Sequence, residues 1–226
     1  MSKHMQRDLD ALQQRLLKMA GNVEDAIHSA TRALETRDAE LAERVIAGDD
    51  AIDRLENDVQ EECLKILALH QPVAIDLRRI SSILLITTDL ERMGDLASGL
   101  AEKALELSHP PYPEIPARLR PMTLRATEMV NRALNALVRS DADEARAVVQ
   151  MDDDVDADND AILAEVILRM KRTAAEIDAG LALHAAVRYV ERIADHATNI
   201  AEDVIYLVEG AMVRHRPQAL QIVPPG

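Results

Sequence analysis

The sequence contains no phenylalanine and no tryptophan, and three tyrosines are its only large aromatic residues in 226 positions. Sheets are typically built from aromatic and β-branched residues, whereas alanine and leucine, which abound here, are strong helix formers. A core without large rings also lets helices approach one another closely. The chain is long enough to bury a sizeable core, and its composition predicts an all-α protein.

Cysteine is nearly absent as well. Cys63 is the single example, so the chain cannot form an internal disulfide or a thiolate-rich metal site, which suits a reducing compartment. Residues 1–16 lack the apolar core of a signal peptide, and no run approaches the ~20 apolar residues of a membrane span. We expect a cytoplasmic protein without membrane insertion, which leaves peripheral docking on a membrane protein open.

Positive charge is also scarce. The formal net charge is −14, and no basic arm or patch is present to neutralise phosphates, which argues against DNA or RNA as a partner. Glycine-rich phosphate loops and nucleophile elbows are missing too. The sequence therefore shows no machinery of an ATPase or a hydrolase, and we expect a protein that is not an enzyme, without catalytic residues.

Apolar periodicity predicts six long helices. Asp38 has the chemistry of an N-cap, Pro72 suits the first turn of the third helix, and Gly210 suits a C-cap. The expected helices span residues 5–34, 38–69, 72–107, 117–139, 141–170 and 173–209. Four prolines mark an internal linker. The predicted units are a first three-helix bundle, a linker, a second three-helix bundle and a flexible tail, at residues 1–107, 108–116, 117–210 and 211–226.

The two halves repeat each other. Residues 89–102, DLERMGDLASGLAE, share six of fourteen positions with residues 189–202, YVERIADHATNIAE. Residues 38–53 share seven of sixteen positions with residues 141–156. The offsets are 100 and 103, so a duplicated three-helix unit explains the whole chain. We predict two tandem antiparallel three-helix bundles.

Acidic pairs recur at equivalent places in this repeat. Glu and Asp four residues apart lie about 40° apart on a helix surface and repel each other. The heptad register places Glu91, Asp95, Glu191 and Asp195 away from the apolar seam, and the preceding helices carry Asp49, Asp53, Asp152 and Asp156. Neighbouring helices could therefore bring four carboxylates together in each half.

Two interpretations of these pairs remain open. A solvated acidic face is the usual explanation of a single pair, and it would make the protein a helical scaffold without metal. Recurrence on two helices of each half favours a metal site with hard oxygen ligands, which suit iron, manganese, magnesium or calcium, with zinc possible.

Other candidate sites are weaker. A ferritin-like di-iron oxidoreductase needs Glu-x-x-His motifs that face a bundle core, and Glu106 with His109 runs directly into two prolines. Asp25 with His28 is expected to be a surface pair. His196, adjacent to Asp195, is a candidate auxiliary ligand, but we expect it to be solvated or to face a partner. Cys63 is expected to be a small core residue. Arg92 and Arg192 are expected to pair with neighbouring acids.

The repeated DLERMGDLASGLAE and YVERIADHATNIAE stretches, with the acidic stretches of the second and fifth helices, resemble the paired signatures of the PhoU family over residues 5–210. The resemblance implies two three-helix bundles and surface metal clusters, most often of iron, held by E/D-x-x-x-D motifs. The implied ligands are Asp49, Asp53, Glu91 and Asp95 in the first half, and Asp152, Asp156, Glu191 and Asp195 in the second.

The resemblance also implies a regulatory role. Family members restrain phosphate uptake by an ABC transporter and keep a sensor histidine kinase in its signalling-off state. The implied partners are the transporter's ATPase subunit and the phosphate-sensing kinase, and we expect a homodimer. Three positions depart from the family pattern: Gly99, which predicts weaker polar support of the first site, Ala194 and Tyr189.

Overall fold

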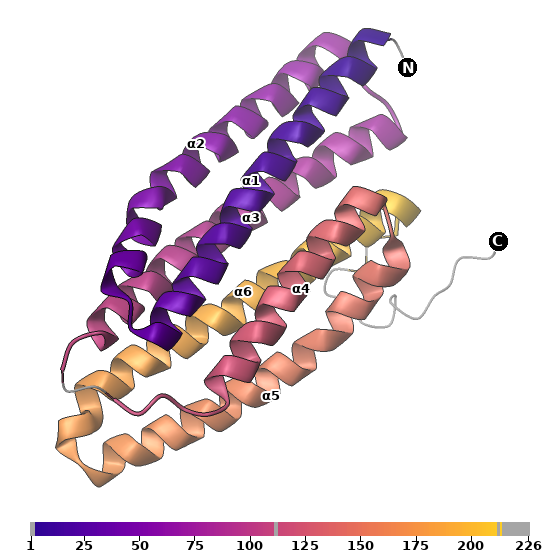
Figure 1. Cartoon of the computed structure of the whole chain (residues 1–226). Helices are drawn as coiled ribbons and strands as arrows, with labels where there is room; N and C mark the ends of the chain where they lie inside the picture. The colour runs from indigo at the N-terminus through magenta and orange to yellow at the C-terminus, as the bar shows by residue number, and fades with distance from the viewer. Residues whose placement is uncertain (1–2, 111–112, 212, 214–226) are drawn as a thin grey trace.

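The computed structural model describes residues 3–110, 113–211 and 213, and within them the chain is helical with no strand. Figure 1 shows six long helices in two groups of three. Their bounds are α1 Lys3–Thr36, α2 Ala39–His70, α3 Ile75–Leu107, α4 Leu119–Arg139, α5 Ala142–Arg172 and α6 Ile177–Glu209, with a short 3-10 helix, η1, at Ala174–Glu176. The predicted all-α fold of two repeated three-helix units is confirmed.

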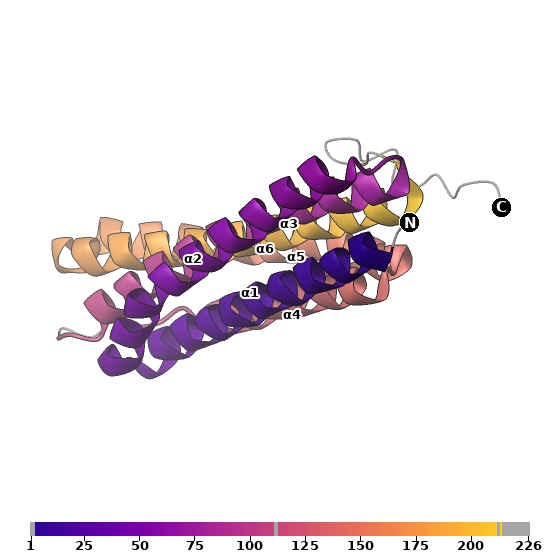
Figure 2. The ribbon, with the colours of Figure 1, turned by 90° about the horizontal axis from the view of Figure 1, so that it is seen from above.

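The two halves lie side by side along their third helices. Within each half, all three helices pack on one another, and the most extensive helix pairing in the molecule joins α3 to α6. Helix α1 also touches α4, whereas α2 and α5 lie at opposite outer edges (Figure 1). In the perpendicular view of Figure 2, α3 and α6 also run along each other. The packing of α2 on α3 is therefore repeated by that of α5 on α6 on the opposite side of the molecule.

Small side chains explain how α3 and α6 pack on so many neighbours. Ala97, Ala101, Ala197 and Ala201 are all fully buried, and alanine allows helix axes to approach while costing the least helix propensity. Longer side chains such as Leu90 fill the space between helices of one half. Burial of each leucine contributes roughly 1.5–3 kcal/mol, so the core needs no large aromatic ring.

The helix ends follow local capping chemistry with two corrections. Asp38 accepts a hydrogen bond from the Leu41 amide and caps α2, and Gly210 ends α6 with a positive φ of 76°. The expectation that Pro72 occupies the first turn of the third helix is wrong, because Gln71 and Ala74 both adopt positive φ and reverse the chain before α3 begins. The expected helix from residue 173 is likewise replaced by η1, and α6 starts at residue 177.

Two arginines, one from each half, hydrogen-bond the backbone of the segment between α3 and α4. Arg37, at the end of α1, donates a hydrogen bond of 2.6 Å to the Pro113 carbonyl, and Arg169 donates one of 2.6 Å to the Glu114 carbonyl. Residues 111–112 of the predicted linker, and nearly all of the predicted tail, lie outside the described residues. None of the described helices combines the length and apolarity needed to cross a bilayer.

Candidate metal centre

Helices α2 and α3 bring acidic side chains together in the first half. Oxygen atoms of Asp53, Glu91 and Asp95 all lie within 4.8 Å of one another. Asp49 lies one turn earlier on α2, near both Asp53 and Asp95. The structure therefore brings together the four residues expected at the first site, at the solvent-accessible edge of the molecule rather than in the bundle core.

Burial and mutual repulsion both act on these carboxylates. The pKa of Asp49 is raised by partial burial first and then by the negative charges of Asp95 and Asp53. Partial burial also raises the pKa of Glu91, followed by the charges of Asp95, Glu56 and Asp53. A cation placed among these groups would relieve both costs, because it replaces lost hydration and offsets the repulsion.

Two contributors to this site were not expected from the sequence. Glu56 lies one turn after Asp53, and the charges of Asp53 and Asp95 help to raise its pKa after the effect of burial. Ser98 lies close enough to Asp49 to offset part of the rise in its pKa. The spacing Asp53-x-x-Glu56 places both side chains on one helix face, so the sequence did carry a signal for Glu56.

The second half repeats the arrangement between α5 and α6. Burial raises the pKa of Asp152 to about 6, and the charges of Asp195 and Asp156 add to the effect. The pKa of Glu191 is raised by burial and then by Asp195. The four residues expected at the second site are therefore electrostatic neighbours, as their counterparts are in the first half.

Several polar atoms of the second site lack partners. Asp152 Oδ1 and Glu191 Oε2 are buried without a hydrogen-bond partner in the described structure. The Thr198 hydroxyl lies close enough to Asp152 to lower its pKa, yet its oxygen makes no hydrogen bond of ordinary geometry. Buried carboxylate oxygens without partners are costly. They fit a hard cation, for which such oxygens are the preferred ligands.

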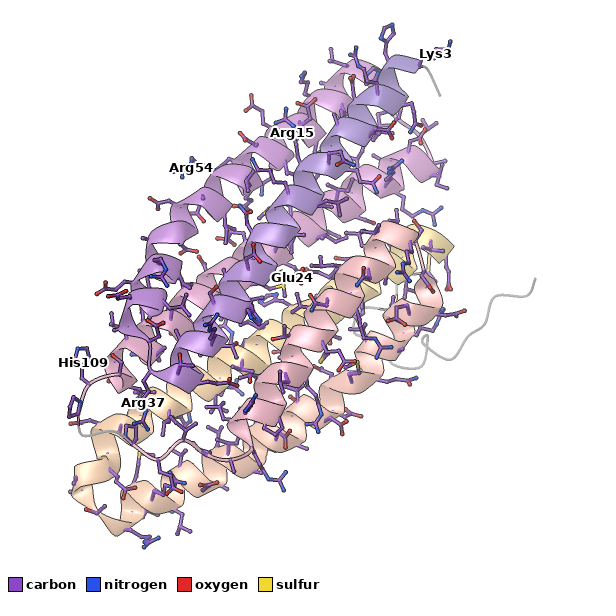
Figure 3. The ribbon with its side chains drawn as sticks, in the orientation of Figure 1. Lys3, Arg15, Glu24, Arg37, Arg54 and His109 are labelled. Carbon is purple, nitrogen blue, oxygen red and sulfur yellow. The ribbon has the colours of Figure 1, made fainter. Side chains whose placement is uncertain are left out.

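Arginines moderate the negative charge. Burial and neighbouring carboxylates raise the pKa of Glu91 and that of Asp195, and the charges of Arg92 and Arg192 offset a part of these two rises. The direct ion pair in the second site comes from Arg188, whose Nη1 lies 2.8 Å from Glu191 Oε1. Arg54, beside Asp53 in the sequence, projects from the outer side of α2 (Figure 3). The expectation that Arg92 and Arg192 form ion pairs with neighbouring acids is wrong for the described residues, where Arg188 makes the pair instead.

His196 has a different role from the one expected. Its Nδ1 lies 2.7 Å from Asp89 Oδ1, and Asn199 Nδ2 donates to the same oxygen at 3.2 Å. Asp89 is on α3 and is buried, while the other two side chains are on α6. The expectation of a solvated or partner-facing histidine is wrong, because His196 contributes to a polar contact between the halves.

Gly99 and Tyr189, two of the positions that depart from the family pattern, form a second contact between the halves, which is a packing contact. A Cβ built on Gly99 would lie 2.8 Å from Tyr189 Cζ, so the ring occupies the space that a side chain would need. Asn199, the counterpart of Gly99, donates to Asp89, and the expectation that Gly99 weakens polar support of the first site stays a prediction.

The difference between Ala194 and its equivalent Gly94 concerns packing. Its equivalent in the first half, Gly94, lies so close to Ile52 that an added Cβ would be 3.0 Å from Ile52 Cδ1. At the position equivalent to Ile52, the second half has the smaller Val155. A smaller neighbour makes room for the methyl group of Ala194.

The other candidate sites stay separate from these clusters. His109 lies beyond the last residue of α3, at the outer end of that helix in Figure 3, so it cannot face a bundle core together with Glu106. Asp25 and His28 are exposed on α1, as expected. Cys63 is fully buried, and burial raises the pKa of its thiol to about 12, which confirms it as a core residue.

Most of the chain is similar to proteins of one family. The PhoU domain model matches residues 16–104 and 119–204. The chain belongs to the PhoU family. It is 41% identical over 215 residues to the phosphate-specific transport system accessory protein PhoU homolog of Pseudomonas aeruginosa, an alignment that covers 95% of this chain and 89% of the relative. The PhoU protein of Escherichia coli K12 is 31% identical over 208 residues, covering 92% and 86%.

Solved structures agree with this assignment. The crystal structure of PhoU from Pseudomonas aeruginosa matches with a TM-score of 0.89 at 40% identity, covering 91% of this chain and 99% of that one. The regulatory protein PhoU from Streptococcus pneumoniae matches with a TM-score of 0.85 at 31% identity, covering 92% and 99%. The relatives are named accessory proteins of phosphate-specific transport, and both halves of this chain lie within the matched regions.

Proposed function

We propose that this protein is a non-enzymatic regulator of phosphate uptake. In this role it restrains a phosphate ABC transporter by docking on the transporter's ATPase subunit, and it keeps a phosphate-sensing histidine kinase in its signalling-off state. The observation that carries the proposal is the family match over nearly the full chain, which includes relatives named for phosphate-specific transport. The net charge of −14 supports protein partners rather than nucleic acid.

A co-purification experiment tests the docking step. The full chain would be immobilised and exposed in turn to the ATPase subunit and to the cytoplasmic portion of the kinase from the same organism, with matched low and high phosphate. We expect stoichiometric retention of at least one partner in high phosphate. Loss of retention of both partners under that condition would contradict the proposed mechanism.

We further propose that the protein acts in the cytoplasm with a metal ion bound at each acidic groove. Iron is the expected metal. Manganese, magnesium and calcium also prefer oxygen ligands, and zinc accepts them. The residues that would hold it are the carboxylates Asp49, Asp53, Glu91 and Asp95 in one half, and Asp152, Asp156, Glu191 and Asp195 in the other. The converging oxygens of the first site and the unpartnered buried oxygens of the second support this donor set.

The chemistry that a bound cation would supply is charge neutralisation and a link between two helices. Asp53 belongs to α2 and Asp95 to α3, so shared ligation would stiffen their groove; Asp156 and Asp195 would do the same for α5 and α6. A groove of fixed shape and reduced charge is a surface that another protein can recognise.

Elemental analysis of protein purified without chelator tests the metal assignment. Asp95→Asn and Asp195→Asn each remove one ligand, while Asp58→Asn and Asp160→Asn remove an exposed acid from α2 and α5 as matched controls. We expect the ligand variants to lose metal and the controls to retain it. Equal metal content in all five proteins, wild type included, would instead favour the helical scaffold with a merely solvated acidic face.

The proposed assembly is a homodimer. Light scattering coupled to size-exclusion chromatography measures the mass directly, and a value near twice the 25.0 kDa of the chain is expected.

A further inference from the structure

Several charged positions differ between the acidic faces of the two halves. Arg54 and Asp154, which have no charged counterpart, are exposed, whereas two other differences concern side chains beside the carboxylates. We define the first carboxylate cluster as Asp49, Asp53, Glu56, Glu91 and Asp95, and the second carboxylate cluster as Asp152, Asp156, Glu191 and Asp195. With the offset of 103 between α2 and α5, the residue equivalent to Glu56 is Asn159. With the offset of 100 between α3 and α6, the residue equivalent to Thr88 is Arg188. Both differences make the second cluster less negative.

Glu56 adds a fifth carboxylate to the first cluster. It is half-buried and follows Asp53 by three residues, so both side chains lie on one face of α2, and its charge also acts on Glu91. Gln60 Nε2 donates a hydrogen bond of 2.7 Å to its Oε1. Its equivalent Asn159 is only 4% exposed, and its Oδ1 has no hydrogen-bond partner among the described residues. An amide oxygen is a hard ligand, but it brings no charge.

Arg188 already holds a ligand of the second cluster. Its guanidinium donates to Glu191 Oε1 at 2.8 Å, and Glu191 is mostly buried with 12% of its side chain exposed. Thr88, in the equivalent place, is neutral and its hydroxyl donates back to the Leu84 carbonyl of its own helix. A cation entering the second cluster must therefore compete with a guanidinium, whereas Glu91 is not engaged in this way by residue 88.

We propose that the first carboxylate cluster, with Glu56 as a further ligand, binds a divalent cation more tightly than the second, in which Arg188 competes for Glu191. Affinity of hard cations for oxygen sites rises with the number of charged ligands, and both differences act in the same direction. This inference rests on the metal-binding part of the proposed function. Its consequence is that limiting metal fills the halves in order, the first before the second.

Manganese(II) titration of proteins with one cluster erased tests the order. Asp152→Asn/Asp195→Asn leaves only the first cluster, and Asp49→Asn/Asp95→Asn leaves only the second. Binding is followed by electron paramagnetic resonance of free Mn²⁺ and by calorimetry on chelator-treated protein, with circular dichroism to verify folding. We expect the Kd of the first cluster to be lower by about tenfold or more, the size of effect typical of a lost ligand-supporting group.

Two further variants assign the difference to residues. Glu56→Gln, made where only the first cluster remains, is expected to raise the Kd toward that of the second. Arg188→Thr, made where only the second remains, is expected to lower the Kd because Glu191 is released. The nearby Asp58→Asn and Asp160→Asn changes serve as controls for lost charge, and neither is expected to shift the Kd by more than about twofold, since exposed charges are strongly screened.

The outcomes separate this inference from the proposed function. Measurable binding with equal Kd values, or with the second cluster tighter, overturns the proposed order while metal binding itself stands. An unchanged Kd in both Glu56→Gln and Arg188→Thr overturns the assignment to these residues. If neither single-cluster protein binds Mn²⁺ while both are folded, the metal-binding part of the proposed function is overturned together with this inference.

Discussion

The Tyr189 ring of α6 lies directly over Gly99 of α3, so that a Cβ at residue 99 would be 2.8 Å from Tyr189 Cζ. This contact belongs to the α3–α6 interface, which joins the two halves. Gly99→Ala is expected to lower the free energy of unfolding by about 1–3 kcal/mol, because overpacking at a fixed interface outweighs the gain in helix propensity. Urea unfolding followed by circular dichroism measures the change.

Gly21→Ala is the matched control for this prediction. Gly21 is also inside a helix, but an added Cβ would meet nothing within 4 Å, so a gain of about 0.5–1 kcal/mol is expected from helix propensity alone. In a Tyr189→Ala background, Gly99→Ala should also become stabilising, since the clash is gone. A stabilising Gly99→Ala in the wild-type background would contradict the interpretation of the contact.

Asp89 is expected to be the most sensitive polar residue of the same interface. Asp89→Ala removes the acceptor of His196 and Asn199 and leaves their polar atoms in a largely buried position. Such orphaned groups cost about 1–3 kcal/mol. Thermal unfolding of chelator-treated protein provides the measurement, so that metal binding at the neighbouring Asp195 does not contribute. Asn199→Ala, which leaves the His196 contact in place, should cost less than Asp89→Ala.

Asp152 is expected to make metal-free protein less stable as the pH rises. Its pKa is raised from 3.8 to about 6 in the folded state, so the folded chain binds this proton more strongly than the unfolded chain. The stabilising contribution is complete below pH 3.8 and is lost between pH 3.8 and about 6. Asp152→Asn should therefore be more stable than the wild type above pH 6 and similar to it below pH 3.8.

Urea unfolding at a series of pH values checks this prediction, with Asp160→Asn on the same helix as the control for one lost charge. Saturating Mn²⁺ should reverse the order at neutral pH, because a metal at the proposed site would bind the deprotonated carboxylate of the wild type and stabilise the folded state by linkage. A difference between wild type and Asp152→Asn that stays constant from pH 3.8 upward would refute the assignment of the raised pKa.

The ion pair between α5 and α6 predicts the opposite pH behaviour. Arg146 donates to both carboxylate oxygens of Glu209, at 2.7 and 2.6 Å, and this hydrogen bonding lowers the pKa of Glu209 below 4.5. Glu209→Gln should destabilise the protein by about 1–2 kcal/mol at neutral pH, since charge-assisted bidentate pairs are among the stronger hydrogen bonds.

The loss in Glu209→Gln should shrink as the pH falls below 4.5, where protonation of Glu209 removes the same pair from the wild type. Chemical unfolding at pH 7 and at several pH values below 4.5 compares the two proteins. Asp143→Asn, which alters only an exposed carboxylate 3.8 Å from Arg146, controls for general charge effects and should change stability little.

Periodicity and repetition predicted the helices and the grouping of the acidic residues because both are local or nearly local patterns. Asp49 and Asp53 share a face of one helix, and the repeat shows which face matters. The side-chain geometry across α3 and α6 could not be obtained in the same way. Asp89 and His196 are 107 positions apart, and their contact depends on how the halves are rotated against each other.

The positions of Pro72 and Arg188 illustrate two other limits. Proline is compatible with both the first turn of a helix and the loop before it, so the positive φ of Ala74 decided the start of α3. Arg188 is one of several arginines near the acidic motif, and sequence spacing alone does not determine which of them reaches Glu191. Glu56 and Ser98, by contrast, follow Asp53 and Asp95 by three residues, so helical spacing alone places them beside the first site.

The contacts between α3 and α6 join residues that are not equivalent in the repeat, so each half presents a different surface to the other. Asp89 of the first half meets Asn199 of the second, and Gly99 of the first half receives Tyr189 of the second. If two first halves paired in the same geometry, each buried Asp89 would face a glycine that offers no side-chain donor. If two second halves paired, each Tyr189 would meet Asn199 where it now finds free space. Divergence after duplication has thus left each half fitted to the other half of its own chain rather than to a copy of itself.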